Sequence, residues 1–236
     1  EVVNMVGEAA NSFYGYLFDG VYSSSAEASS ANLMNEKLVK YKAGDAKFID
    51  LSGPAGSPDG IINQYDKTTL GSSMPDLYGG LQNTFTYKRW ILDTYINVVS
   101  GNEVFNYVRY KNEAMTGMEN QSASVLNRWQ NEGQLTTMPR ALWNDPVGNS
   151  AFSSRWIEDG SYLRVQNISL AYKIPNKFLQ FRNAEFYISA NNVLTLSKYL
   201  GYDPEFATSY SHAEQGVDYG QTPQARQFII GIKLGL

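Results

Sequence analysis

Side chains that could act on a substrate are few in this sequence, and they are scattered. The single histidine, His212, lies beside Ser211 and close to Glu214 in a polar segment. A Ser-His-acid nucleophile system needs a base that a third group orients, and one loop histidine provides no such arrangement. We therefore interpret His212 as a solvated loop residue and expect no catalytic residues.

Two pairs of neighbouring carboxylates offer a second possible chemistry. Glu158 and Asp159 are adjacent, and Asp203 and Glu205 flank a proline. Glycoside hydrolysis uses two carboxylates that lie about 5–10 Å apart. Neighbouring acids also cap turns and form loop salt bridges, and Asp-Pro is ordinary turn chemistry. The sequence favours these structural roles over those of a hydrolase.

Four aspartates are candidate metal ligands, and they share a segment rich in Gly, Ser and Pro: Asp45, Asp50, Asp59 and Asp66. Calcium needs several oxygen ligands that converge within one short loop. The sequence leaves calcium binding by this segment open and indicates no other cofactor.

The composition narrows the class of protein. The 236 residues are 43% hydrophobic and 18% charged, with a formal charge of −4, which excludes disorder by low hydrophobicity and argues against a nucleic-acid-binding surface. The absence of cysteine excludes a disulfide scaffold and thiolate catalysis. No segment approaches the run of about 20 apolar residues that a membrane helix needs, whereas the strands of a membrane barrel only alternate.

Alternation of apolar and polar residues with a period of two is the strongest pattern in the chain. It predicts antiparallel strands of about 10–12 residues, long enough to cross the apolar band of an outer-membrane barrel. Six segments are candidates: 13–22, 81–88, 89–98, 167–174, 185–191 and 226–236. Six strands cannot close a barrel of this type, so we expect the remaining strands to precede residue 1.

The connections agree with a barrel. The chain reverses with almost no loop at Lys88-Arg89, and residues 175–182 form a second short link. The segments 23–76, 101–159 and 197–224 are long and rich in Gly, Asn, Ser and Pro. Short periplasmic turns and long extracellular loops are typical of outer-membrane barrels. Because successive antiparallel strands alternate in direction, counting strands from the short turns predicts that the C-terminus lies toward the periplasm.

Several stretches resemble the C-terminal end of the SusC/RagA family of TonB-dependent outer-membrane transporters. The segment 156–175 begins WIEDGSYLR, segment 186–195 reads FYISANNVLT, and segment 198–205 reads KYLGYDPE. Further matches lie upstream in the expected order: 13–16, 19–20, 44–45 and 71–76. The sequence departs from the family in the loop 50–63, which has an insertion and fewer carboxylates, and in its last residue, Leu236.

The resemblance implies a fold and a function for the whole protein. It implies an all-β transmembrane barrel of about 22 strands, of which residues 1–236 are the C-terminal segment. The plug domain, TonB box and signal peptide would precede residue 1. It also implies TonB-dependent import of oligosaccharides or oligopeptides through the outer-membrane lipid, with a SusD-like surface lipoprotein as a lid.

Aromatic and polar residues are assigned roles from their positions. One set lies near strand ends and is expected to form a membrane-interface girdle: Tyr14, Tyr16, Tyr87, Trp90, Tyr172 and Tyr187. A second set lies in the long loops and comprises candidate contacts for substrate or lid: Trp129, Trp143, Tyr199, Tyr202, Tyr210 and Tyr219. Arg89, Asp93 and Asn97 are expected to face the lumen of the barrel.

One alternative stays open at this stage. A soluble β-sandwich that displays aromatic loops and binds glycan would also combine strands with exposed rings. The length of the strands and their tight connections favour the transporter.

Overall fold

The computed structural model describes residues 1–175, 183–206 and 215–235, and these residues form two compact units. The unit that we call the sheet unit contains the described residues of 75–102, 159–206 and 221–235. The other, the loop unit, contains residues 1–74, 103–158 and 215–220.

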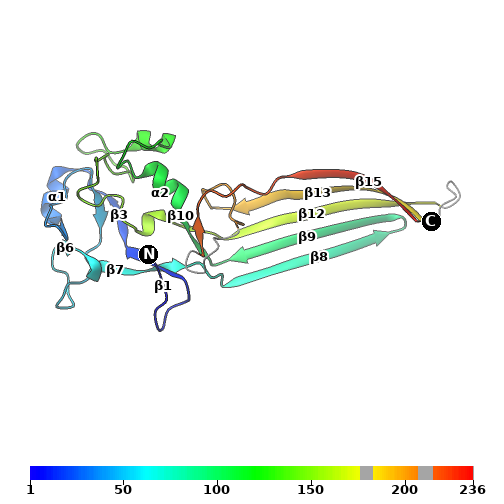
Figure 1. Ribbon diagram of the computed structural model, residues 1–236, viewed down its shortest axis with the longest axis horizontal. Coiled ribbons are helices and arrows are strands. Elements are labelled where there is room, and N and C mark those ends of the chain that lie inside the picture. Colours follow the sequence, from blue (N-terminus) through cyan, green and yellow to red (C-terminus); the bar gives the residue numbers. More distant parts are fainter. Residues whose placement is uncertain (176–182, 207–214, 236) are drawn as a thin grey trace. The chain divides into compact units, whose positions relative to one another are not determined.

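The sheet unit is a single antiparallel sheet in the order β15-β13-β12-β9-β8 (Figure 1). Its strands are β8 (Leu77–Tyr87), β9 (Trp90–Ser100), β12 (Tyr162–Ile174), β13 (Asn183–Ser197) and β15 (Gln227–Gly235). They contain 11, 11, 13, 15 and 9 residues, whereas strands of globular proteins are typically 5–6 residues long. The prediction of long antiparallel strands is confirmed for these segments.

The predicted reversal at Lys88-Arg89 is a two-residue hairpin. Tyr87 pairs with Trp90, and Lys88 adopts a positive φ of 56°. Arg89 therefore lies in the turn and not on the polar side of a strand, which corrects its expected place along β9. The second predicted link falls mostly on residues 176–182, outside the described residues, although the β12–β13 register is described up to Ile174 and Ala184.

The predicted strand over residues 13–22 is wrong as a sixth strand of this sheet. These residues form two short strands of the loop unit, β2 (Ser12–Tyr16) and β3 (Phe18–Val21). Phe13 and Tyr22 are 0% and 1% exposed, because their rings pack into the interior of the loop unit. In residues 13–22, the alternation of aromatic residues therefore reflects burial inside the loop unit and not a surface that faces a membrane.

The long connections contain short helices and strands, although they are rich in Gly, Asn, Ser and Pro. Their helices are α1 (Ser25–Ala31) and α2 (Tyr107–Glu113), with short 3-10 turns at Gln64–Asp66, Ala123–Asn127 and Ser154–Trp156. The further strands outside the sheet are β1 (Val2–Val3), β4 (Met34–Asn35), β5 (Ala46–Phe48), β6 (Ile61–Ile62), β7 (Lys67–Ser72), β10 (Glu103–Asn106), β11 (Ile157–Asp159) and β14 (Val217–Asp218). Among the described residues, no helix is both long and apolar enough to cross a membrane.

A buried ion pair joins two of these connections. Asp45 is 0% exposed, and its carboxylate accepts hydrogen bonds from the Arg140 guanidinium at 2.7 and 3.1 Å and from the Asn149 amide at 3.1 Å. Gly44, with φ of 85°, lies against the ring of Trp129, whose Cε3 would be 2.4 Å from an added Cβ. Gly44 and Asp45 thus hold Trp129, Arg140 and Asn149 against the connection 23–76.

A second charged cluster surrounds Trp156, which is fully buried. The Arg155 guanidinium stacks 4.2 Å from the ring centroid of Trp156, and burial lowers the pKa of Arg155 to about 10. Arg109 pairs with Glu158 and, at 3.3 Å, with Glu113. The acid Glu158 therefore serves this cluster, in keeping with the structural interpretation of the Glu158-Asp159 pair.

The remaining candidate metal ligands each serve a local turn. Asp66 is fully buried and accepts hydrogen bonds from the backbone amides of Leu51, Ser52 and Asn63 at 2.8, 3.1 and 2.8 Å. Asp50 accepts from the Gly60 amide at 2.7 Å, and its buried Oδ1 has no hydrogen-bond partner among the described residues. Burial, and then the neighbouring Asp66 carboxylate, raise the pKa of Asp50.

We predict that Gly231→Val destabilises the sheet and that Gly79→Val does not. A Cβ on Gly231 would lie 2.5 Å from the Tyr187 ring, whereas nothing lies within 4 Å of the Cβ position at Gly79. Displacing a packed ring costs about 1–3 kcal/mol. Apparent melting temperatures of the full-length protein in detergent would show the difference, and equal losses in both variants would contradict the packing described.

We also predict that Asp50→Asn strengthens the loop around Asp66 at neutral pH. A carboxylic acid whose pKa is raised on folding makes the fold more stable when protonated, and this stability is lost as the pH rises through the raised pKa. The variant amide keeps an acceptor for Gly60 and offers a donor toward Asp66. Hydrogen exchange of the full-length protein should show several-fold greater protection of the Leu51 and Gly60 amides at pH 7, and less difference near pH 4.

Asp66→Asn is the matched control, because the same change there weakens acceptors that serve three backbone amides. It should lower protection at both pH values. Lower protection in Asp50→Asn at pH 7 would contradict the assigned roles.

Candidate functional site

The sheet unit has one apolar face and one polar face, which the strand register fixes. Residues on the apolar face are opposite one another on neighbouring strands. They include Leu81, Phe85, Tyr87, Trp90, Leu92, Ile96, Leu163, Val165, Ile168, Leu170, Tyr172, Phe186, Ile188, Leu194, Leu196, Phe228, Ile230, Ile232 and Leu234. This apolar face is exposed: Phe85, Ile188 and Ile230 are 61%, 46% and 71% accessible.

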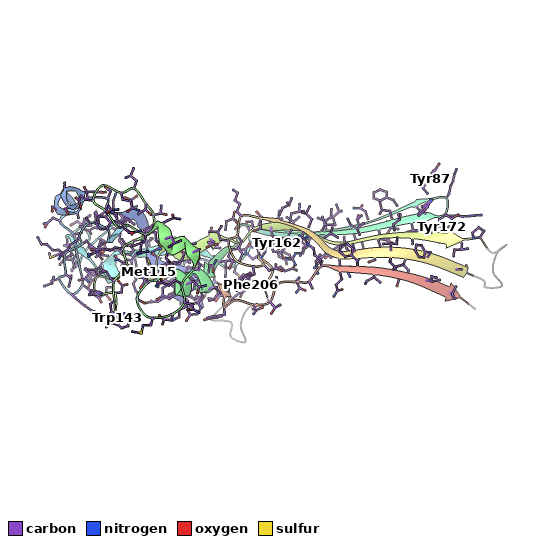
Figure 2. The ribbon with its side chains drawn as sticks, turned by 90° about the horizontal axis from the view of Figure 1, so that it is seen from above. Tyr87, Met115, Trp143, Tyr162, Tyr172 and Phe206 are labelled. Carbon is purple, nitrogen blue, oxygen red and sulfur yellow. The ribbon has the colours of Figure 1, made fainter. Side chains whose placement is uncertain are left out.

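An aromatic row crosses the apolar face at its hairpin end. Tyr87 pairs with Trp90, Trp90 with Tyr172, and Tyr172 with Phe186, and the ring centroids of Trp90 and Tyr172 are 4.8 Å apart. Figure 2 shows Tyr87 and Tyr172 at this end of the strands and Tyr162 toward the other end. Aromatic residues at this level of a sheet are typical of the belt at a membrane–water interface.

Three of the tyrosines expected in the girdle lie elsewhere. Tyr14 and Tyr16 belong to β2 in the loop unit, where the Tyr16 ring lies 5.5 Å from that of Phe48 and burial raises the Tyr16 pKa to about 12. Tyr187 lies on the polar face, where its ring covers Gly231. Proximity to a strand end did not reveal which face a residue occupies or to which unit it belongs.

The polar face carries a ladder of hydrogen bonds across the strands. The Thr84 hydroxyl donates to Asp93 at 2.6 Å, and the Asn167 amide donates to Asn191 at 2.7 Å. Asn97 Nδ2 donates to the Tyr162 hydroxyl at 3.4 Å. Asp93 and Asn97 are therefore on the polar face, and their exposure to a barrel lumen stays a prediction.

A β-bulge changes the phase of the alternation along β12. The register shifts between Val165 and Asn167, so that odd-numbered residues up to Val165 share the apolar face with even-numbered residues from Ile168 onward. A bulge of this kind adds one residue to one strand of a pair. It keeps Leu163 and Ile168 on the same face although their spacing is odd.

Two sequence motifs meet through a buried ion pair at the end of the sheet remote from the aromatic row. Arg164 of β12 is 2% exposed and pairs with Asp203, which is also buried, and with Glu205 at 3.1 Å. Asp203 also accepts hydrogen bonds from the backbone amides of Glu205 and Gln224 at 2.9 and 3.0 Å. The Asp203 and Glu205 pair thus neutralises a strand arginine, consistent with the structural interpretation.

The predicted loop aromatics divide by exposure. Trp129 donates its indole N–H to the Ser23 carbonyl at 3.0 Å, and Tyr199 is 8% exposed, so both are packing residues. Trp143, Tyr202 and Tyr219 are 60%, 73% and 49% exposed, and the Tyr219 ring also packs 4.9 Å from that of Tyr107. Tyr210 and His212 lie outside the described residues.

The metal hypothesis receives no support from the described part of the chain. No group of three or more His, Cys, Asp or Glu side chains that could hold an ion is present there. Asp45 and Asp66 already accept hydrogen bonds from protein groups through both of their oxygens, and calcium binding by this segment stays a prediction.

The reasoning from sequence missed two arginines near the paired motifs. Arg164 belongs to the segment that carried the family resemblance, and an arginine within an alternating strand is itself a signal for a buried partner. Arg226 immediately precedes β15 and shares a cavity with Arg164.

No protein-family model matches the chain, but curated proteins do. The chain is 32% identical to TonB-dependent receptor P26 of Formosa agariphila, over 98% of this chain and 23% of that protein. It is 31% identical to receptor P3 of the same organism, over 97% and 22%. TonB-dependent receptor SusC of Bacteroides thetaiotaomicron is 27% identical over 97% and 20%.

Solved structures share the fold. The RagAB peptide importer in its open-open state matches 96% of this chain and 22% of that chain, with 24% identity and a TM-score of 0.71. Its closed-closed state matches 95% and 23%, with a TM-score of 0.70. The chain thus spans between a fifth and a quarter of the length of the relatives that it matches. The two relatives of 31% and 32% identity, which the chain matches over nearly its whole length, show that it belongs to the family of TonB-dependent receptors.

Proposed function

We propose that this chain forms part of the wall and of the extracellular loops of an outer-membrane β-barrel that imports nutrient oligomers by TonB-dependent transport. The observation that carries the proposal is the exposed apolar face of the sheet unit. Large apolar side chains on all five strands point to one side, and the polar ladder lies on the other. Apolar-out and polar-in alternation is the pattern of a strand between lipid and a lumen.

The edges of the sheet support a larger barrel. Among the described residues, β8 and β15 each pair on one side only. Unpaired backbone groups in lipid cost several kcal/mol each, so membrane sheets close on themselves. We propose that strands from the rest of the protein pair with both edges, with the short β8–β9 turn toward the periplasm.

The substrate is proposed at the level of oligosaccharides or oligopeptides. The choice rests on two proteins to which the chain is similar, the receptor SusC and the RagAB peptide importer. A SusD-like surface lipoprotein is the proposed partner, and the exposed rings of Trp143 and Tyr219 are its proposed contacts. Tyr and Trp suit such a role because they bury a large area with little loss of side-chain entropy.

A soluble glycan-binding sandwich is the less favoured function. A sandwich needs a second sheet whose apolar face covers the first. In the described part of the sheet unit there is one sheet, and its apolar face is exposed.

A pair of adjacent substitutions tests the proposal. Ile168→Arg places a charge near the middle of the apolar face, where arginine facing lipid costs about 2–4 kcal/mol. Ser169→Arg places the same charge on the polar face opposite Asp93. We predict that the first variant lowers the amount of heat-modifiable barrel in the outer-membrane fraction several-fold and that the second leaves it near the level of the unmodified protein.

The comparison is informative because both variants add the same side chain to neighbouring positions of one strand. Equal assembly of the two variants, or recovery of the unmodified full-length protein in the aqueous phase without detergent, would contradict the proposed function.

A further inference from the structure

A small cavity lies at the end of the sheet unit remote from the hairpin. It has a volume of about 180 Å³, and its lining includes Arg164, Asn192, Thr195, Tyr202, Asp203 and Arg226. It forms beyond the point where β13 loses its pairing with β15, because that pairing ends at Asn191 and Gln227 while β13 continues to Ser197.

The hydrogen-bond acceptor capacity of the acid in this cavity is already used. Asp203 accepts from the Arg164 guanidinium and the Glu205 amide through one oxygen, and from the Gln224 amide through the other. Its negative charge is paired with Arg164. Glu205 also pairs with Arg164, at 3.1 Å, so Asp203 and Glu205 are structural groups that hold Arg164 in place. The positive charge that remains for an incoming anion is that of Arg226, which also lines the cavity.

Donors in the same cavity remain free. Arg164 is 2% exposed, and its buried Nε has no hydrogen-bond partner among the described residues. Arg226 is exposed and forms no ion pair within the described part of the chain. Thr195 adds a hydroxyl group. A buried donor without a partner is unfavourable, so the cavity is suited to a ligand that supplies acceptors.

We infer that this cavity binds an oxyanion, a carboxylate or a sulfate group carried by the imported ligand. The planar fork of an arginine matches two oxygens of such a group, and Arg226 is an exposed arginine that lines the cavity. The ring of Tyr202, 73% exposed, provides an apolar surface for the part of the ligand that carries the charge. The inference rests on the proposed function, and it adds that the importer binds acidic ligands in preference to neutral ones.

The test measures binding of defined probes to the full-length protein in detergent by titration calorimetry at constant ionic strength. The probes are glucuronate, inorganic sulfate and neutral glucose. A charge-assisted hydrogen-bonded contact contributes about 1.5–3 kcal/mol, so Arg226→Gln should weaken binding of the preferred anion by at least about tenfold. Arg89→Gln removes the same charge from the hairpin turn and should leave affinity unchanged.

Tighter binding of glucuronate or of sulfate than of glucose, lost in Arg226→Gln alone, supports the inference, and the preferred probe identifies the oxyanion. Equal binding of all three probes, or equal binding by the two arginine variants, would overturn it. Uptake of a neutral oligosaccharide by cells with and without TonB tests the proposed function separately. If uptake depends on TonB but the protein binds the three probes equally, only the inference about oxyanion binding is overturned, and the proposed function stands.

Discussion

An apolar sheet face that the described residues leave exposed is the constraint on which the rest of the sheet unit depends. A soluble domain would cover such a surface, because apolar area exposed to water is unfavourable by roughly 25 cal/mol per Å². Here the surface extends over all five strands of the sheet, from Phe85 on β8 to Ile230 on β15. Lipid is the solvent in which this arrangement is favourable. The alternation along each strand, the aromatic row and the polar ladder all agree with the proposed wall, which has lipid on one side only.

The loop unit follows a different rule, since its segments bury their own aromatic and charged groups. Tyr22, Tyr41 and Phe48 form part of one apolar cluster, and burial raises the pKa of Tyr22 to about 12. The Asp45–Arg140 ion pair connects segments far apart in the sequence. These connections are folded elements, and a folded unit can hold exposed rings such as Trp143 in fixed positions for contact with a partner.

Strands with clean alternation were predictable because successive side chains of a strand point to opposite faces of the sheet. In 228–234, every second residue is apolar, and the β15 pairing confirms that these residues share a face. The pattern failed at residues 13–22, where Phe13 and Tyr22 are buried by long-range packing that no local period reports. It also could not show that Arg164 meets Asp203, because Asp203 lies in the segment after β13, and no local period reports a contact between residues 39 positions apart.

Solvent accessibility along β12 tests the central claim most directly. The chain has no cysteine, so single cysteines at successive positions from Tyr162 to Lys173 can each carry a nitroxide in the full-length protein in lipid. The account predicts that oxygen dissolved in lipid reaches labels at 163 and 165, then at 168, 170 and 172, while a water-soluble relaxation agent reaches labels at the accessible positions of the polar face, 167, 169 and 173. The change from odd to even numbers should fall at Gln166, where the bulge lies. Uniform accessibility, or alternation that keeps one phase through Gln166, would contradict the account.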